Sequence, residues 1–250
     1  MGLLKSNIIV NADDFGLSDA VNQAIESCFR NGLVNQTSIM VNMPFYKDAV
    51  LKSKKGNFFD RVGLHLNLTE GIPLTDSIKK TKLCTDGLFN QSIIRNKIKR
   101  FVLKNDEIKA VREECVAQIE SYLREDFPFL HLDSHQHIHT NYSIFKILCP
   151  LIKTYGFKSI RLSRVIPDSG FSFLKQLYKK FFNDKIKDIN FGNESVYKSL
   201  KWFGSIDDLI VSKDKIDNDL FELMVHPVMI NGRIYDSVTH KDLFECLMEG

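Results

Sequence analysis

The fold is decided near the N-terminus by residues 8–16, which read IIVNADDFG. The apolar, β-branched run at 8–10 predicts a buried strand, and two adjacent carboxylates, Asp13 and Asp14, follow it. Ser18 is the predicted N-cap of a helix whose apolar residues recur at steps of three and four until Gly32 ends it. A strand, a polar turn and an amphipathic helix together form the first unit of an α/β fold.

The same alternation continues along the chain. Strand-like apolar runs lie at 37–41, 62–68, 129–133, 159–162 and 223–225, and helix-like periodicity lies at 106–125, 144–155 and 241–248. Strands that alternate with helices are typical of repeated βα units around a parallel sheet. The sequence has no internal repeat and no linker rich in Pro, Gly or Ser. We therefore expect a single domain over residues 1–250, built as an α/β barrel or a doubly wound sheet.

Two stretches rich in lysine interrupt this rhythm, at 78–104 and 171–187. The second mixes aromatic residues with lysines and predicts a helix that packs its aromatic side chains inward and leaves its lysines in solvent. The first alternative is an insertion that covers the substrate. A contact with a membrane or a nucleic acid is the second alternative.

Composition excludes several classes of protein. Hydrophobic residues make up 44% of the 250 residues and charged residues 26%, which is typical of a globular chain and unlike a disordered or collagen-like one. The net charge of +3 is too small to predict a nucleic-acid or membrane partner. The five cysteines form no Cys-x-x-Cys pair, no apolar run approaches the ~18 residues of a membrane span, and the first residues do not resemble a signal peptide. We therefore expect a cytoplasmic protein with reduced thiols.

Histidines lie in or directly after three of the predicted strands. His65 interrupts one apolar strand, His226 ends another, and residues 131–139 read HLDSHQHIH. From position 135 on, the histidines of this stretch alternate with other residues, so they would point the same way in an extended segment. Each histidine alone is as well explained by a packed or solvated side chain, whereas their combination indicates a divalent-metal site.

These polar groups share one location in the predicted fold. Asp13, Asp14, His135 and His226 each follow a predicted strand, and His65 lies inside or near the end of another. In barrels and open parallel sheets, side chains at the carboxyl ends of the strands converge on one site. One carboxylate and two imidazoles leave positions on a metal open for water and substrate, which is typical of a catalytic metal site. The second carboxylate is then available as a general base.

Four motifs carry a resemblance to a known family. They are NADDFGLS at 11–18, GLHLNLTEG at 63–71, HLDSHQHIH at 131–139 and MVHP at 224–227. In this order they resemble the YdjC-like carbohydrate deacetylases, the family of the chitooligosaccharide deacetylases. The resemblance implies a (β/α) barrel of the glycoside hydrolase/deacetylase type and metal-dependent removal of acetyl groups from N-acetylated sugars. The segments 78–104 and 165–205 match no pattern of this family, and we expect substrate specificity to depend on them.

The resemblance also assigns roles to individual residues. It implies Asp14, His65 and His135 as the metal ligands, Asp13 as the catalytic base, His226 as the general acid and Arg161 as the residue that orients the base. His137 and His139 are the less favoured candidates for the general acid. The choice between Asp13 and Asp14 as base and ligand rests on analogy with related deacetylases. The family implies Mg²⁺, whereas two imidazoles and a carboxylate suit Zn²⁺ at least as well.

The resemblance implies an acetylated mono- or oligosaccharide as substrate and a homodimer. From the small net charge and the absence of a long apolar run we expect no nucleic-acid or membrane partner. Two alternatives stay open. Amidohydrolases and phosphoesterases also use His-x-His metal sites in barrels, but the amidohydrolase pair lies on the first strand, where this chain has two aspartates. A non-catalytic sugar-binding relative would not need a second carboxylate beside the ligands. We expect the only tryptophan, Trp202, to pack in the core rather than to stack on a sugar.

Overall fold

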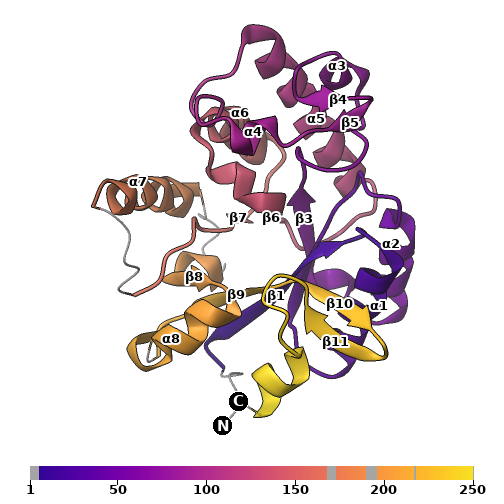
Figure 1. Cartoon of the computed structure of the whole chain (residues 1–250), viewed down its shortest axis with the longest axis vertical. Coiled ribbons are helices and arrows are strands. Elements are labelled where there is room, and N and C mark those ends of the chain that lie inside the picture. The colour runs from indigo at the N-terminus through magenta and orange to yellow at the C-terminus, as the bar shows by residue number, and fades with distance from the viewer. Residues whose placement is uncertain (1–5, 168–172, 190–195, 217, 250) are drawn as a thin grey trace.

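The chain folds around one curled sheet of seven parallel strands (Figure 1). The structure is a computed structural model and describes residues 6–167, 173–189, 196–216 and 218–249. In the order in which they lie side by side, the strands are β7 (Ser159–Ile160), β6 (His131–Ser134), β3 (Val62–Leu66), β2 (Gln36–Ile39), β1 (Ile8–Phe15), β9 (Phe221–Val225) and β8 (Trp202–Gly204). Every neighbouring pair is parallel, as the alternation of strands and helices predicts.

The strand order is that of a barrel with one gap. From β7 back to β1 the strands follow chain order, and β1 then pairs with β9, the last of the seven. β7 and β8 form the two edges, and an antiparallel bridge between Val165 and Phe203 spans the gap between them. In a doubly wound sheet the order would instead reverse at a central switch point. The expected α/β barrel is therefore confirmed, in an incompletely closed form.

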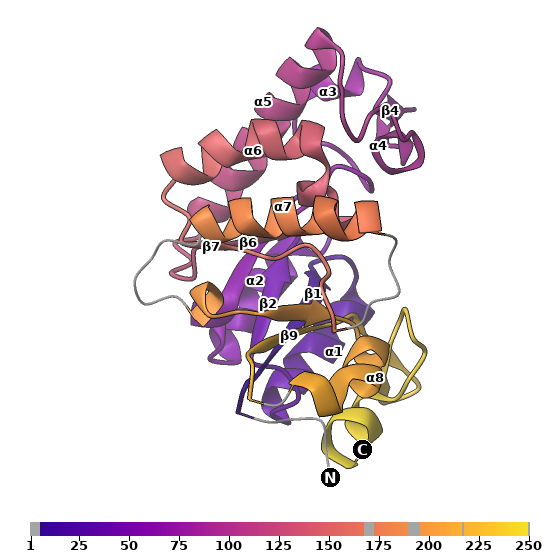
Figure 2. The same ribbon diagram turned by 90° about the vertical axis from the view of Figure 1, so that its left-hand side faces the viewer.

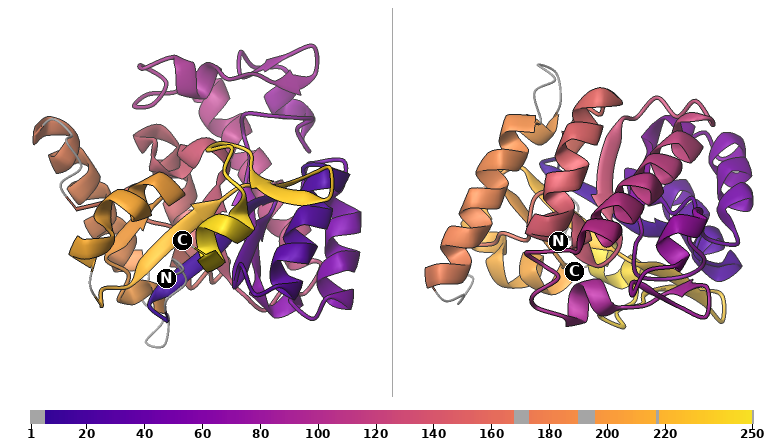
Figure 3. Two further views of the ribbon diagram at one scale, coloured as in Figure 1. Left: turned by 60° about the horizontal axis from the view of Figure 1, so that its bottom comes forward. Right: turned by 90° about the horizontal axis from the view of Figure 1, so that it is seen from above.

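Helices cover the outside of the curled sheet (Figures 2 and 3). The longer ones are α1 (Asp19–Arg30), α2 (Tyr46–Lys55), α5 (Asn105–Leu123), α6 (Tyr142–Thr154), α7 (Phe173–Ile189) and α8 (Ile206–Ile216), and the short ones include η1 (Phe59–Arg61), η3 (Val196–Lys198) and η4 (Glu245–Glu249). Ser18 caps α1 as expected, because its Oγ accepts the Val21 N–H at 3.3 Å. In the part of the chain that the structure describes, no helix is both long and apolar enough to cross a membrane.

Two excursions leave the barrel at the carboxyl ends of its strands. The first holds α3 (Asp76–Lys79), the paired β4 (Cys84–Thr85) and β5 (Leu88–Phe89), and α4 (Ser92–Arg95), and it lies beyond the tip of β3 (Figure 1). The second is the hairpin of β10 (Pro227–Ile230) and β11 (Arg233–Asp236), which packs against α1. Both excursions therefore start at the edge of the sheet where the site residues are expected.

Helix α7 only partly follows the expectation for residues 171–187. Its C-terminal half buries Phe182, whose ring contacts Phe145 of α6 at a centroid distance of 5.2 Å. Its first two turns expose Phe173 and Leu174, and Phe181 is also exposed. Phe171 lies outside the described residues. The prediction that the aromatic side chains pack inward is therefore wrong for Phe173 and Phe181, whereas Tyr178 and Phe182 pack against the core.

The histidine-rich stretch is not extended after β6. Residues His135–Thr140 form the short helix η2, in which Gln136 and His137 have left-handed backbone angles with φ near 50°. The Ser134 hydroxyl accepts the His139 N–H at 3.0 Å and so turns the chain back on itself. The expectation that His135, His137 and His139 point the same way is therefore wrong.

Candidate metal centre

The inner face of the curled sheet is polar and buried. Strand alternation directs apolar residues such as Leu64 and Leu132 outward to the helices and polar residues inward. The inward residues, each at most 2% exposed, are Asn11, Asp13, Ser38, His65, Asp133, Arg161 and Glu222. Buried charges on this scale are tolerated only when they are paired, so their contacts decide what the interior can do.

A break in strand pairing lets Asp13 and Asp14 both face the site, although they are adjacent in the chain. Neighbouring residues of a regular strand point to opposite faces. Here the register between β1 and β2 shifts between Ala12 and Phe15, and Asp14 has a left-handed backbone with φ of 67°. Asp13 keeps its place in the interior, while Asp14 turns toward the histidines at the rim.

The predicted metal ligands meet at one oxygen atom. Asp14 Oδ1 lies 3.1 Å from His65 Nε2 and 2.8 Å from His135 Nδ1. Together the three residues form a group whose ligand atoms lie within 4.8 Å of one another. His65 Nε2 is buried, and its contact with Asp14 Oδ1 is an ion pair rather than an aligned hydrogen bond. A carboxylate oxygen with two ring nitrogens fits a divalent cation, so the residues present match the expected kind of site.

The second nitrogen of His65 is held from behind. Its Nδ1 lies 2.7 Å from Asp133 Oδ1, and because a carboxylate only accepts hydrogen bonds, this nitrogen carries the proton. The Ser38 hydroxyl donates to the other oxygen of Asp133 at 2.8 Å. Such a carboxylate behind a histidine fixes the tautomer and leaves the opposite nitrogen facing the metal position.

Without a metal, the group balances its charge with protons. Burial lowers the pKa of His65, but the carboxylates of Asp133 and Asp14 outweigh burial and raise it to about 10. Burial also opposes the charge on His135, and Asp14 with Glu70 raises its pKa to about 9. The two histidines in turn hold the pKa of Asp14 well below its usual range, against the effect of burial. At neutral pH the Asp14 group therefore holds positive charge, which protons supply here and which a metal ion can supply in their place.

A second group of possible ligands already has its cation. Asp13, His65 and Asp133 also lie within 4.8 Å of one another. Arg161 donates from Nη1 to Asp13 Oδ2 at 2.6 Å and from Nη2 to Asp13 Oδ1 at 2.7 Å, and the same Nη2 lies 2.8 Å from Asp133 Oδ2. This bidentate pairing fixes the Asp13 carboxylate beside the metal position. The guanidinium satisfies the charge of this second group, which leaves the Asp14 group as the candidate metal centre.

His226 follows β9 and is held by a residue of the hairpin. The His226 backbone N–H donates to Asp236 Oδ2 at 2.7 Å, and the ring Nδ1 lies 3.6 Å from the same oxygen. Burial lowers the pKa of His226, but the charges of Asp236, Asp13 and Asp14 outweigh it and raise the pKa above its ordinary value. These carboxylates therefore shift the pKa of His226 in the direction that favours its protonated form.

His137 and His139, the less favoured candidates for the general acid, differ from His226. His139 is buried, with Nδ1 2.5 Å from the Ser134 hydroxyl and Nε2 3.1 Å from the Arg161 carbonyl oxygen, so both of its nitrogens are engaged. Burial and the charge of Arg161 lower the pKa of His137 to about 4, so this ring is neutral at pH 7. The His137 ring packs edge-on against Phe203 at 5.5 Å. Burial also lowers the pKa of His139, so both rings favour the neutral form and are weaker candidates for the general acid than His226.

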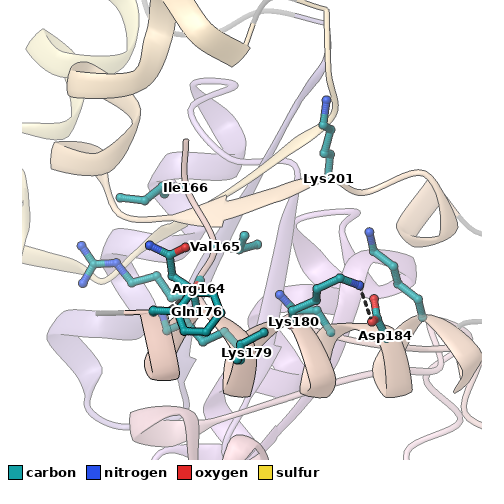
Figure 4. A pocket seen from close by; sticks show the side chains of 12 residues that line it. Arg164, Val165, Ile166, Gln176, Lys179, Lys180, Asp184 and Lys201 are labelled. Carbon is teal, nitrogen blue, oxygen red and sulfur yellow. Dashed lines mark hydrogen bonds and ion pairs between the residues drawn. The ribbon is translucent and has the colours of Figure 1, made fainter. Parts of the chain in front are cut away.

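A separate cavity of about 470 Å³ lies between α7 and residues 164–166 (Figure 4). The charged residues in its lining are Arg164, Lys179, Lys180, Lys187, Lys201 and Asp184. Figure 4 marks the Lys180–Asp184 ion pair, which spans 2.7 Å on α7. The residues predicted to act on a metal or a substrate do not line this cavity, so the expected chemistry lies elsewhere.

Comparison with known proteins agrees with the motifs. The profile of the YdjC-like protein family matches residues 7–244. The chain belongs to the YdjC-like family. A carbohydrate deacetylase of Clostridium beijerinckii is 30% identical to it over 241 residues, which cover 93% of this chain and 86% of the relative. A carbohydrate deacetylase of Halalkalibacterium halodurans is 33% identical over 191 residues, covering 70% of this chain and 78% of the relative.

A solved structure supports the fold of this YdjC-like chain. It is that of an Enterococcus faecalis protein provisionally assigned to cellobiose-phosphate cleavage, with a TM-score of 0.64 and 24% identity. The match covers 90% of this chain and 82% of the other. At this identity, the likeness extends to the barrel and not to the reaction.

Sequence reasoning missed several carboxylates that hold the predicted site residues of this YdjC-like protein, and Glu70 beside His135 is one of them. Asp133 lies behind His65, Glu222 Oε1 accepts from Arg161 Nε at 2.6 Å, and Asp236 holds His226. The signal for Glu222 is its place between the apolar Phe221 and Leu223. Asp133 follows Leu132 in the period-two alternation of its strand, although Ser134 comes after it. Asp236 has no such signal, since its contact depends on how the hairpin folds back.

Proposed function

We propose that the protein is a metal-dependent carbohydrate deacetylase that removes acetyl groups from N-acetylated saccharides such as chitooligosaccharides. The observation that carries the proposal is the convergence of Asp14, His65 and His135 beside an Asp13 carboxylate fixed by Arg161. Membership of the YdjC-like family and two relatives named carbohydrate deacetylase support the sugar amide as the substrate class. A purely sugar-binding role leaves the second, buried carboxylate without a purpose.

The metal ligands in this proposal are Asp14, His65 and His135. A bound divalent cation supplies Lewis acidity and lowers the pKa of a coordinated water. Two imidazoles match Zn²⁺ or another first-row metal better than Mg²⁺, which prefers oxygen ligands, although the family resemblance implies Mg²⁺. Acetate release by protein refilled with each metal distinguishes the two.

The chain's own residues carry the proton transfers. Asp13, held by the Arg161 fork, accepts a proton from the attacking water as the water oxygen bonds to the acetyl carbon. The bond between the carbonyl carbon and the sugar nitrogen then breaks. His226, whose pKa is raised by Asp236 and the other nearby carboxylates, donates its proton to the leaving nitrogen. The products are acetate and the free amino sugar.

Three related expectations stay predictions. They are a single domain over residues 1–250, a homodimer and a cytoplasmic location. The molar mass of the protein in solution tests the homodimer directly.

Acetate release tests the proposed reaction. Chelator-stripped protein is refilled separately with Mg²⁺ and Zn²⁺ and assayed on mono-, di- and trisaccharides of N-acetylglucosamine, beside an Asp13→Asn variant. We expect release that requires a metal and is lost in the variant. Full activity of Asp13→Asn in the presence of metal would contradict the assignment of the base, and no release from any of the three saccharides would contradict the substrate class.

A further inference from the structure

His135 lies between two carboxylates. Its Nδ1 is 2.8 Å from Asp14 Oδ1, and its Nε2 is 3.1 Å from Glu70 Oε2. The two nitrogens of the ring point in different directions, on either side of Cε1. Glu70 and Asp14 therefore contact different edges of the ring. Glu70 is accordingly not among the residues whose ligand atoms converge on the metal position.

The arrangement at His135 mirrors that at His65. At His65, Nδ1 faces the Asp133 carboxylate and Nε2 faces Asp14. At His135 the two nitrogens exchange roles, because Nε2 faces Glu70 and Nδ1 faces Asp14. In both cases a carboxylate that only accepts hydrogen bonds stands behind the ring.

The Glu70 backbone is held by a buried network. Asn67, which is fully buried, accepts the Glu70 N–H with Oδ1 at 3.1 Å and donates from Nδ2 to the Glu70 carbonyl oxygen at 2.7 Å. Gln118 of α5 bonds to the Asn67 backbone from both of its amide atoms, at 2.6 and 3.0 Å. The main chain of Glu70 is therefore fixed, while half of its side chain remains exposed at the mouth of the site.

We propose that Glu70 is a positioning residue, which fixes the tautomer of His135 with the proton on Nε2 and so aims the Nδ1 lone pair at the metal. This inference rests on the metal centre of the proposed function. It assigns Nε2 of His65 and Nδ1 of His135 as the two nitrogen ligands. Carboxylate partners of metal-bound histidines typically change metal affinity by 10- to 100-fold when they are removed.

Glu70 is a cleaner test of this role than Asp133. Asp133 is buried and also contacts Arg161, so its removal leaves a buried guanidinium without one of its partners. Glu70 is half exposed, and its side chain contacts only His135 among the hydrogen bonds and ion pairs of the described residues. Replacing Glu70 therefore leaves the fold intact and isolates the effect on the histidine.

The experiment measures Zn²⁺ affinity of chelator-stripped protein by calorimetric titration. We expect Glu70→Ala to weaken binding by about 10- to 100-fold. Glu70→Gln should weaken it less, because the amide oxygen still accepts the Nε2 proton. Glu113→Ala is the matched control, since Glu113 is a partly exposed glutamate on α5 that pairs only weakly with Lys109 at 4.0 Å, and it should leave the affinity unchanged.

The ¹⁵N signals of His135 in the Zn²⁺-loaded protein give a second reading. We expect the wild type to show metal at Nδ1 and a proton at Nε2, and Glu70→Ala to lose this single state. Unchanged affinity with an unchanged His135 signal overturns the inference. A loss in Glu70→Gln as large as in His135→Ala also overturns it, because Glu70 would then be a ligand.

The same titration separates this inference from the proposed function. Wild-type protein that binds Zn²⁺ but releases no acetate contradicts the proposed reaction and leaves the role of Glu70 intact. Wild-type protein that binds neither Zn²⁺ nor Mg²⁺ overturns both, because no metal is then present for His135 to face.

Discussion

The interior network around Arg161 and the rim group around Asp14 each contain one of two adjacent residues of β1, Asp13 and Asp14, yet they balance their charges differently. Arg161 brings a permanent cation to the carboxylates of Asp13, Asp133 and Glu222. The Asp14 group has two histidines, whose positive charge depends on protons that a metal can replace.

This difference separates a fixed scaffold, the Arg161 network, from the Asp14 group, which can exchange its cation. A guanidinium stays charged at any pH that the protein tolerates, so the Arg161 network stays fixed through a reaction. The rim group can take up or lose protons and metal. One residue belongs to both in function, because Asp13 is held by the scaffold and lies next to the exchangeable position.

Removing the scaffold's cation should have the largest effect. Arg161→Met leaves three buried carboxylates without a counter-charge, which we expect to cost about 3–5 kcal/mol of unfolding free energy and to abolish activity. Urea-induced unfolding measures the change. Arg161→Lys should be intermediate, because an ammonium cannot make the bidentate contact. A stability of Arg161→Met close to that of the wild type would mean that the network is not needed to hold the barrel.

Removing the base should affect the rate and spare the metal. We expect Asp13→Asn to lower kcat by about 10²- to 10⁴-fold, because an amide at this position cannot take the proton of the attacking water. The amide still accepts a hydrogen bond from Arg161, so the barrel should remain folded. Equal losses of metal affinity and of rate would instead indicate that Asp13 is a ligand.

The pH dependence of metal binding should separate the rim group from the scaffold. The pKa values of His65 and His135 are raised to about 10 and about 9, so both rings are protonated near neutral pH in the metal-free protein. Ligands must lose their protons to bind metal, so affinity should rise with pH by up to about two log units per pH unit below pH 9. Titrations in buffers of different ionisation enthalpy count the released protons. Affinity that does not change with pH would contradict the assignment of these ligands.

Weakening the support of His226 should have the smallest effect. Asp236→Asn removes the nearest negative charge, so the pKa of His226 should fall toward its ordinary value. The protonated acid is then lost at lower pH, and the alkaline limb of the kcat profile should shift to lower pH with little change in KM. An alkaline limb at the wild-type position would argue that His226 is not the general acid.

Much of the barrel could be predicted from the sequence, because period-two and helical periodicity are local signals. The polar turn after residues 8–10 and the Ser18 cap follow from residues close to one another in the chain. The partners of the site residues could not be predicted in the same way. Asp236 reaches His226 only through the hairpin, and Glu70, in the bend after β3, reaches His135 at the start of η2.

The bend after β6 shows the same limit. A spacing of two predicts a shared face only if the chain stays extended, and here the Ser134 hydroxyl competes for the backbone and starts a helix. The histidines of this stretch therefore differ in function because they differ in their contacts, which the spacing alone does not predict. His135 reaches Asp14, whereas His139 packs under Arg161.

Metal binding by the two aspartate variants tests the division between scaffold and exchangeable site most directly. Calorimetric titration of chelator-stripped wild type, Asp13→Asn and Asp14→Ala with Zn²⁺ should give one metal per chain in the wild type and in Asp13→Asn, and no binding in Asp14→Ala. Binding that survives in Asp14→Ala and disappears in Asp13→Asn would contradict this account, because the cation would then belong to the carboxylate that Arg161 holds.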